Sequence, residues 1–224
     1  LSRGLGMCIR DSLITAGPTY EKIDPVRFIG NYSSGKMGFA LAEACAEAGA
    51  EVMLVAGPVS LKTNHSSIDR IDVESAEEMY RAVLSEYDRS DIAIMCAAVA
   101  DYAPETVSDV KLKRTGEDRI LRLRPNPDIA AELGRRKRPG QCLVGFALET
   151  NDEEMNARLK MEKKNLDFIV LNSLRDAGAG FQCDTNKVTV IGKQGEPMEI
   201  PCKPKIEVAA DIVDIIGRYV SEDR

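Results

Sequence analysis

The stretch LITAGPTYEKIDPVRFIGNYSSGKMGFALAEACAEAG, residues 13–49, contains the pattern that decides the fold. Its apolar start, Leu13–Ala16, predicts a short buried strand, which Gly17-Pro18 ends. A long polar connection follows, and from about Lys36 the apolar residues recur at helical spacing. This apolar stripe consists of Met37, Ala40, Leu41, Ala44 and Ala48. A buried strand joined by a loop to an amphipathic helix is typical of the first unit of an α/β fold.

The residues directly before that helix, Asn31, Ser33, Ser34 and Gly35, are the first candidates for ligand binding. The first turn of a helix has backbone N–H groups without helical partners, and the helix dipole places positive charge there. Such a position suits an anion, and Gly17 lies at the same edge of a parallel sheet. We therefore expect this region to bind a phosphate or a carboxylate of the substrate.

Two better-known phosphate-binding motifs do not fit this stretch. Residues 30–36 match G-x-x-x-x-G-K, but Met37 follows where a P-loop needs Ser or Thr to hold Mg²⁺. Gly30 also lies far beyond the strand, whereas a P-loop follows its strand directly. The dinucleotide fingerprint G-x-G-x-x-G fails as well, because Gly17-Pro18-Thr19 does not lead straight into a helix.

The composition is that of a globular protein, with 224 residues, 44% hydrophobic and 29% charged. A net charge of −6 argues against a general nucleic-acid-binding protein. No apolar run approaches the length of a membrane span, and no secretory signal pattern opens the chain. The six cysteines are widely spaced without C-x-x-C, and His65 is the single histidine. These features favour a reduced, cytoplasmic protein that lacks a structural metal.

The domain organisation is simple. Residues 1–12, LSRGLGMCIRDS, are assigned to a linker or an unassigned terminus, because they provide little apolar lead-in to the first strand. Residues 13–224 contain no repeat and no low-complexity linker, so we expect a single domain there.

Strands and helices alternate along the rest of the chain. Further strands are expected at residues 51–56, 68–73, 92–96, 120–123, 142–147 and 168–171, and a β-hairpin at 187–191 and 198–200. Helices are expected from Ser75 to about Tyr87 with a capping box to Glu78, from N-caps at Asn126 and Asn151, and over residues 205–220. The pattern predicts a Rossmann-like α/β fold, with a mostly parallel sheet, helices on both faces and a C-terminal β-hairpin addition.

Charged residues near the expected strand ends have two interpretations each. Asp101 follows the small residues 97–100, where a base could approach the backbone, or it ends a solvated turn. Lys111 opens the basic run KLKR, which is either a flap over a phosphate or solvated surface. Lys160 and Lys164 share one helix face and repel by about 0.2–0.5 kcal/mol unless an anion lies between them. A solvated basic face is the alternative for this pair.

Seven ordered blocks resemble the phosphopantothenoylcysteine synthetase family, and together they cover the chain from Leu13 to Tyr219. The blocks are GPTYEKIDPVRFIGNYSSGKMG (17–38), AGPVSL (56–61), AAVADY (97–102), KLKR (111–114), NPDI (126–129), VGFALET (144–150) and KKNLDFIVLN (163–172). The basic block departs from the family's Lys-x-Lys-Lys, because Arg114 replaces its last lysine.

The resemblance implies a set of site residues. The family's essential asparagine corresponds to Asn31, which with Lys111 would be catalytic. Positions that contact the nucleotide in the family correspond to Met95, Cys96, Ala97, Asp101, Lys111, Pro127, Asp128, Ile129, Ala130, Phe146, Lys160 and Lys164.

The implied reaction joins 4′-phosphopantothenate to L-cysteine through an acyl-cytidylate, with CTP as co-substrate and Mg²⁺ as cofactor, in coenzyme A biosynthesis. The choice of CTP over ATP follows from resemblance to the bacterial members alone. The family further implies a homodimer and a possible fusion to a phosphopantothenoylcysteine decarboxylase, with no nucleic-acid or membrane partner. Two other functions remain open on the residues themselves: an NAD(P)-dependent oxidoreductase and a non-catalytic nucleotide-binding domain.

Overall fold

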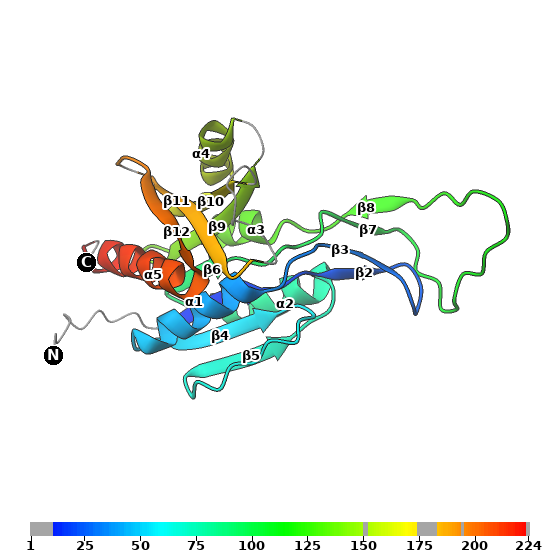
Figure 1. The fold of residues 1–224 in the computed structure, drawn as a ribbon, viewed down its shortest axis with the longest axis horizontal. Coiled ribbons are helices and arrows are strands. Elements are labelled where there is room, and N and C mark those ends of the chain that lie inside the picture. The colour runs from blue at the N-terminus through cyan, green and yellow to red at the C-terminus, as the bar shows by residue number, and fades with distance from the viewer. Residues whose placement is uncertain (1–10, 150–151, 174–182, 194, 223–224) are drawn as a thin grey trace.

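The computed structural model describes residues 11–149, 152–173, 183–193 and 195–222, and its centre is an eight-stranded sheet (Figure 1). The strand order is β12-β11-β10-β9-β6-β1-β4-β5. The strands are β1 (Asp11–Ala16), β4 (Glu51–Ala56), β5 (Ile68–Asp72), β6 (Ile92–Met95), β9 (Cys142–Glu149), β10 (Phe168–Ser173), β11 (Thr185–Gly192) and β12 (Met198–Pro204). The first strand therefore begins two residues earlier than the sequence suggested.

Strand direction follows the expected pattern. The six strands from β10 to β5 pair in parallel, whereas β11 and β12 add to the β10 edge in antiparallel orientation. The mostly parallel sheet and the C-terminal hairpin are thus confirmed. Because β1 lies between β4 and β6, its carboxyl end is the centre of the edge at which ligands bind in such sheets.

Helices cover both faces of the sheet, as expected. On one face α1 (Lys36–Glu47) packs beside α5 (Lys205–Glu222), and their side chains meet strand residues such as Ile14. On the other face α2 (Ala76–Tyr87), α3 (Ile129–Arg136) and α4 (Glu153–Lys163) cover residues such as Leu13. Successive β1 residues point to opposite faces, so a continuous apolar run fills both cores. None of the helices in the described residues is both long and apolar enough to cross a membrane.

Two antiparallel ribbons project beyond the sheet and form an arm (Figure 1). One ribbon pairs β2 (Tyr20–Lys22) with β3 (Phe28–Gly30), and the other pairs β7 (Tyr102–Pro104) with β8 (Leu123–Pro125). The sequence predicted a polar loop for the first ribbon and a strand at 120–123 for the second. The bounds of the second prediction were wrong, since β8 begins at Leu123 and only this residue of 120–123 belongs to a strand.

Asp24 joins the turn of the first ribbon to the connection between β7 and β8. Its buried carboxylate accepts hydrogen bonds from the backbone N–H groups of Val26 (2.8 Å), Arg27 (2.9 Å) and Leu112 (3.1 Å). The Arg27 side chain also pairs with this carboxylate and donates to the Leu112 carbonyl oxygen at 2.5 Å. Burial raises the pKa of Asp24, but these hydrogen bonds outweigh burial and hold the pKa well below its usual range.

The helix starts agree only partly with the predictions. Ser75 and Glu78 form the expected capping box at α2. At α3 the N-cap is Asp128, because the Asn126 side chain instead donates to the Ala100 carbonyl oxygen at 2.8 Å. The N-cap of α4 is Asp152, and the expected Asn151 lies outside the described residues.

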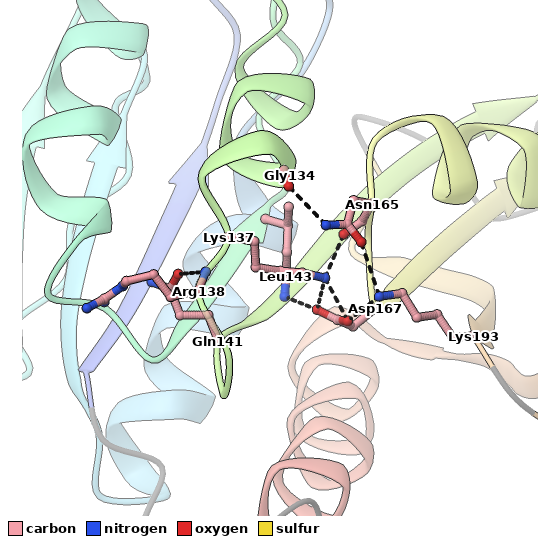
Figure 2. A network of polar contacts seen from close by, with 8 residues as sticks. All are labelled: Gly134, Lys137, Arg138, Gln141, Leu143, Asn165, Asp167 and Lys193. Carbon is pink, nitrogen blue, oxygen red and sulfur yellow. Dashed lines mark hydrogen bonds and ion pairs between the residues drawn. The ribbon is translucent and has the colours of Figure 1, made fainter.

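A charge network at the edge opposite the carboxyl strand ends holds the start of β9 against the start of β10 (Figure 2). The buried carboxylate of Asp167 accepts from Lys137 (2.8 Å), from Lys193 (2.9 Å) and from the backbone N–H of Leu143 (2.8 Å). Lys137 also donates to the Asn165 carbonyl oxygen at 2.7 Å. A buried carboxylate with this many donors is stabilised in its charged form.

We predict that Asp167→Ala lowers the free energy of unfolding by about 3–5 kcal/mol, because it leaves the buried ammonium of Lys137 without its carboxylate. The matched control is Asp211→Ala, which removes a more exposed ion pair with Lys203 and should cost about 1 kcal/mol or less. Urea unfolding of both variants measures the difference. Equal losses would show that the Asp167 network contributes no more than a surface pair.

Candidate active site

Two adjoining cavities open at the carboxyl ends of the parallel strands. The larger has a volume of about 480 Å³ and the smaller about 330 Å³. They share part of their walls: Ala97, Val99, Asp101, Phe146 and Lys160. Two ligands, one in each cavity, could therefore contact each other at this shared wall, which we call the junction.

The turn after β6 forms the junction, and hydrogen bonds from neighbouring segments hold it. The N–H of Ala98 donates to the Gly17 carbonyl oxygen at 2.9 Å, which joins the turns after β1 and β6. The hydroxyl oxygens of Thr15 and Thr19 accept from the N–H groups of Ala97 (3.1 Å) and Ala100 (2.9 Å). The small side chains of this segment leave its backbone accessible to a flat ligand.

The start of α1 forms one wall of the larger cavity. Its N-cap, Gly35, has φ 78°, a left-handed conformation that favours glycine, and no side chain caps the helix. Gly38 lies so close to the end of β1 that a Cβ atom there would be 2.5 Å from the Ala16 Cβ. Lys36, Met37 and Gly38 all line the cavity, so the positive end of the helix dipole faces the cavity.

Asn31 lies at the mouth of the larger cavity, between the arm and α1. Its side-chain Nδ2 donates to the Ala98 carbonyl oxygen at 2.9 Å. An amide nitrogen carries two hydrogens, so this contact orients the group while a second N–H can serve a ligand carbonyl. The asparagine that the family resemblance implies to be essential therefore has the geometry of a hydrogen-bond donor in the larger cavity.

The smaller cavity is bounded by the start of α3 and the end of α4. Lys160 lines both cavities, whereas Lys164, at the C-cap of α4, lines the smaller one and pairs with Asp128 at 3.0 Å. The Asp128 side chain also caps α3 by accepting from the Ala131 N–H at 3.0 Å. The Asp128 carboxylate already binds Lys164 and the Ala131 N–H. We therefore expect residues 127–130 to contact a nucleotide through their backbone groups.

The one cysteine among the described residues that line the larger cavity is Cys96. Burial raises its pKa to about 12, and Lys205 lowers it only partly. The thiol is therefore neutral near pH 7, and thiolate nucleophilic catalysis at this position is disfavoured.

Most of the predicted site residues meet at these cavities. Those that line one or both are Asn31, Ser33, Ser34, Gly35, Met95, Cys96, Ala97, Asp101, Pro127, Asp128, Ile129, Ala130, Phe146, Lys160 and Lys164. Gly17 and Lys111 line neither cavity. Gly17 instead supports the junction through its carbonyl group, and Lys111 is exposed on the arm.

Sequence reasoning missed four polar residues of the larger cavity: Lys36, Asn172, Asn186 and Lys205. Asn172 follows the buried part of a parallel strand and could have been found from the strand-end rule. Asn186 and Lys205 come from the antiparallel addition and the last helix, where no local pattern distinguishes a cavity residue from a surface one. In the described part of the chain, no group of three or more His, Cys, Asp and Glu residues could hold a metal ion.

Residues 8–219 match the protein family described as "DNA/pantothenate metabolism flavoprotein C-terminal domain". Over 204 residues the chain is 56% identical to "Cysteine/Cysteine sulfinic acid decarboxylase" from an unknown prokaryotic organism, covering 91% of this chain and 57% of that protein. Over 205 residues it is 51% identical to "Coenzyme A biosynthesis bifunctional protein CoaBC" from Bacillus subtilis (strain 168), covering 92% of this chain and 50% of that protein. The chain thus spans about half the length of these curated relatives.

The fold is also similar to a solved structure, that of the C-terminal domain of Coenzyme A biosynthesis bifunctional protein CoaBC. The TM-score is 0.81 at 42% sequence identity, with 95% of this chain and 96% of that chain covered.

We predict that Lys160→Ala weakens nucleotide binding about tenfold, because Lys160 lies at the junction where phosphate charge would be placed. Lys164→Ala should have a smaller effect, since Lys164 lines the smaller cavity and Lys160 lines both. Lys163→Ala is the matched control, because this exposed lysine of the same helix lines neither cavity. Calorimetric titration with CTP measures all three, and equal affinities would mean that the pair is a solvated basic face.

Proposed function

The chain belongs to the DNA/pantothenate metabolism flavoprotein C-terminal domain family, and on that premise we propose that it ligates 4′-phosphopantothenate to L-cysteine. The relatives named CoaBC are described as coenzyme A biosynthesis proteins, so the proposed product, 4′-phosphopantothenoylcysteine, would serve that pathway. The amide bond would form through an acyl-nucleotide intermediate, with release of pyrophosphate and a nucleoside monophosphate.

The observation that carries this proposal is the pair of cavities with a common wall. A ligase of this kind must bring the carboxylate of one substrate to the α-phosphate of another. The smaller cavity, with Lys160 and Lys164, suits the nucleotide, and the larger, at the start of α1, suits the anionic acid. The two reacting groups would then meet at the shared wall beside Asp101 and Phe146.

In the first half-reaction the acid's carboxylate oxygen attacks the α-phosphorus, and the bond to the bridging oxygen of pyrophosphate breaks. The protein's contribution is position and charge, because phosphoryl transfer needs little covalent help. Lys160 lies in both cavities, so its ammonium group would neutralise charge on the α-phosphate as the bond changes occur.

In the second half-reaction the amine of cysteine attacks the acyl carbon, and the nucleoside monophosphate leaves. Negative charge develops on the carbonyl oxygen during this attack. The Asn31 amide, oriented by the Ala98 carbonyl, would donate to that oxygen, and the α1 dipole would favour the same charge. Asn31 therefore acts by polarisation and positioning, without transferring a proton.

The co-substrate and the cofactor belong to the same proposal. CTP is favoured because the small-residue edge at Ala97-Ala98 and the loop of Phe146 resemble the cytidine-selecting bacterial form, and these three residues line the larger cavity. Mg²⁺ prefers carboxylate and phosphate oxygens, and among the residues that the structure describes Asp101 is the carboxylate that borders both cavities. Bound there with the triphosphate, Mg²⁺ would neutralise phosphate charge, with most of its ligands coming from phosphate and water oxygens.

The arm supports the proposal that two copies of the chain pair. Its ribbons and the connection between them expose apolar side chains, including Phe28 (49%), Val110 (71%) and Ile120 (89%). Exposed apolar groups in such number favour a protein partner over water. Because Lys111 lies on this arm and lines neither cavity of its own chain, pairing with a second copy would provide its route to a bound nucleotide.

The surroundings of the reaction are also proposed from the relatives and the chemistry. The CoaBC relatives are named as bifunctional proteins of about twice this length, which favours association with a phosphopantothenoylcysteine decarboxylase that would consume the product. Cytoplasmic location fits the use of a nucleoside triphosphate. It also fits Cys45, Cys96, Cys142, Cys183 and Cys202, which are free thiols.

The proposal is tested by pyrophosphate release that depends on 4′-phosphopantothenate. With cysteine present, we expect 4′-phosphopantothenoylcysteine as product and a higher kcat/KM with CTP than with ATP at matched Mg²⁺. Equal or better kcat/KM with ATP would contradict the nucleotide choice alone. No pyrophosphate release with either nucleotide would instead favour a non-catalytic nucleotide-binding domain.

A second prediction separates the two half-reactions. Asn31→Asp should release pyrophosphate but stall with the acyl-nucleotide bound, because a carboxylate replaces the donor that the developing oxyanion needs. The loss in product formation should be about 10²–10³-fold. Lys111→Ala should fail earlier, at pyrophosphate release. The two variants are distinguished by measuring pyrophosphate release in a single turnover and then analysing the quenched enzyme by mass spectrometry. If both variants block pyrophosphate release equally, the assignment of Lys111 to the first half-reaction and Asn31 to the second is wrong.

A further inference from the structure

Thr19 is a polar residue that lies behind the junction rather than in either cavity. It follows the turn after β1 and directly precedes β2, it is 0% exposed, and it lines neither cavity. Its backbone N–H donates to the Ala98 carbonyl oxygen at 3.3 Å, and its hydroxyl oxygen accepts from the Ala100 N–H at 2.9 Å. Thr19 therefore holds both ends of the segment 98–100.

This segment is the part of the wall that both ligands would touch. Val99 lines both cavities, whereas Ala98 lines the larger one and Ala100 the smaller one. The side chains of the two alanines are too small to anchor the segment by packing alone, so backbone hydrogen bonds set its position. A change at either end of the segment would move a wall that the two cavities share.

The hydroxyl group is the part of Thr19 that a valine of similar shape would lack. Ala100 is 6% exposed, so its N–H has little access to water. A buried N–H without an acceptor is unfavourable, and the segment would shift to find another one. Valine at position 19 would keep the volume of the side chain and the backbone N–H, and it would remove only this acceptor.

The Ala98 carbonyl group connects Thr19 to Asn31. Its oxygen accepts from the Thr19 N–H and, at 2.9 Å, from Nδ2 of Asn31. The second bond orients the Asn31 amide, so the direction of its other N–H depends on where the Ala98 carbonyl lies. A misplacement of about 1 Å in a site can cost about 100-fold in rate, because a donor must meet the charge that develops in the transition state.

We propose that Thr19 is a positioning residue for the second half-reaction, whose hydroxyl group holds the segment 98–100 so that the Ala98 carbonyl orients Asn31. The proposal rests on the proposed ligase function for the role of Asn31. Thr19 itself lines neither cavity, so its effect passes through the backbone of the segment and the amide of Asn31.

The test compares Thr19→Val, which removes the acceptor, with Thr19→Ser, which keeps it. Ser90→Ala is the matched control, because Ser90 is 4% exposed and its hydroxyl donates to the Glu86 carbonyl oxygen at 3.0 Å. Ser90 precedes β6, at the end of that strand opposite to the junction. Thr19→Ala, which leaves room for a water molecule as acceptor, replaces Thr19→Val if the latter does not fold. Thermal unfolding of each variant establishes that folded proteins are being compared.

Single-turnover kinetics then measure each half-reaction. Thr19→Val should slow the conversion of the bound acyl-nucleotide to product by about 10- to 100-fold, with a smaller change in pyrophosphate release. Thr19→Ser and Ser90→Ala should remain close to the unsubstituted chain. In an Asn31→Ala background, Thr19→Val should add little, because the group that it positions is absent.

Three kinetic results would each overturn the proposal. The first is a rate of product formation in Thr19→Val that equals that of Ser90→Ala. The second is a loss in Thr19→Ser as large as that in Thr19→Val, which would exclude the hydroxyl group as the cause. The third is a double variant in which the losses of Thr19→Val and Asn31→Ala multiply, which would mean that Thr19 does not act through Asn31.

A spectroscopic readout separates this inference from the ligase function. In proton–nitrogen NMR spectra, the side-chain NH₂ signal of Asn31, identified by its loss in Asn31→Ala, should shift in Thr19→Val but not in Thr19→Ser or Ser90→Ala. The Ala100 N–H should also exchange faster with deuterated water in Thr19→Val. If the unsubstituted chain forms no product and both changes occur, the ligase function fails and the positioning stands. If the chain is an active ligase and Thr19→Val changes neither these signals nor product formation, the function stands and the positioning is wrong.

Discussion

The site depends on the hydrogen bonds that join the turn after β1 to the turn after β6. Ala98 donates to Gly17 at 2.9 Å, Thr19 donates to Ala98 at 3.3 Å, and Asn31 donates to the same Ala98 oxygen at 2.9 Å. These contacts connect the sheet, the base of the arm and the loop before α1. Because both cavities share the residues beside this turn, a shift of one turn would change the two substrate positions together.

Much of the fold could be predicted from the sequence, because its elements follow local rules. The apolar run of β4 and the capping box of Ser75 and Glu78 are properties of a few neighbouring residues. The arm was missed because its ribbons are stabilised from a distance. Asp24 contacts Leu112, 88 residues away, and no pattern near Asp24 indicates that contact. Asn126 was misjudged as an N-cap for a similar reason, since its partner is the Ala100 carbonyl.

The site could be predicted where strand ends and helix starts converge, and less well elsewhere. Asn31, Asp101 and Lys160 were found because the carboxyl edge of a parallel sheet is a known location for ligands. Lys205 was not found, because a lysine at the start of a helix is usually solvated, and its burial depends on the antiparallel strands that come just before it. Conversely, Lys111 has the chemistry expected of a site residue but lies on the arm, away from both cavities.

The packing of α5 against α1 also has a consequence for synthesis of the chain. The apolar face of α1 is complete at Glu47, but its partner helix begins only at Lys205. At typical translation rates, the intervening stretch of about 160 residues takes roughly 10–30 s to emerge. During that interval Leu41 and its neighbours cannot pack against α5, so the nascent chain exposes hydrophobic surface that chaperones would bind. A ribosome that stalls before the last helix would therefore release a product prone to aggregation, even though nearly all of the sheet had been made.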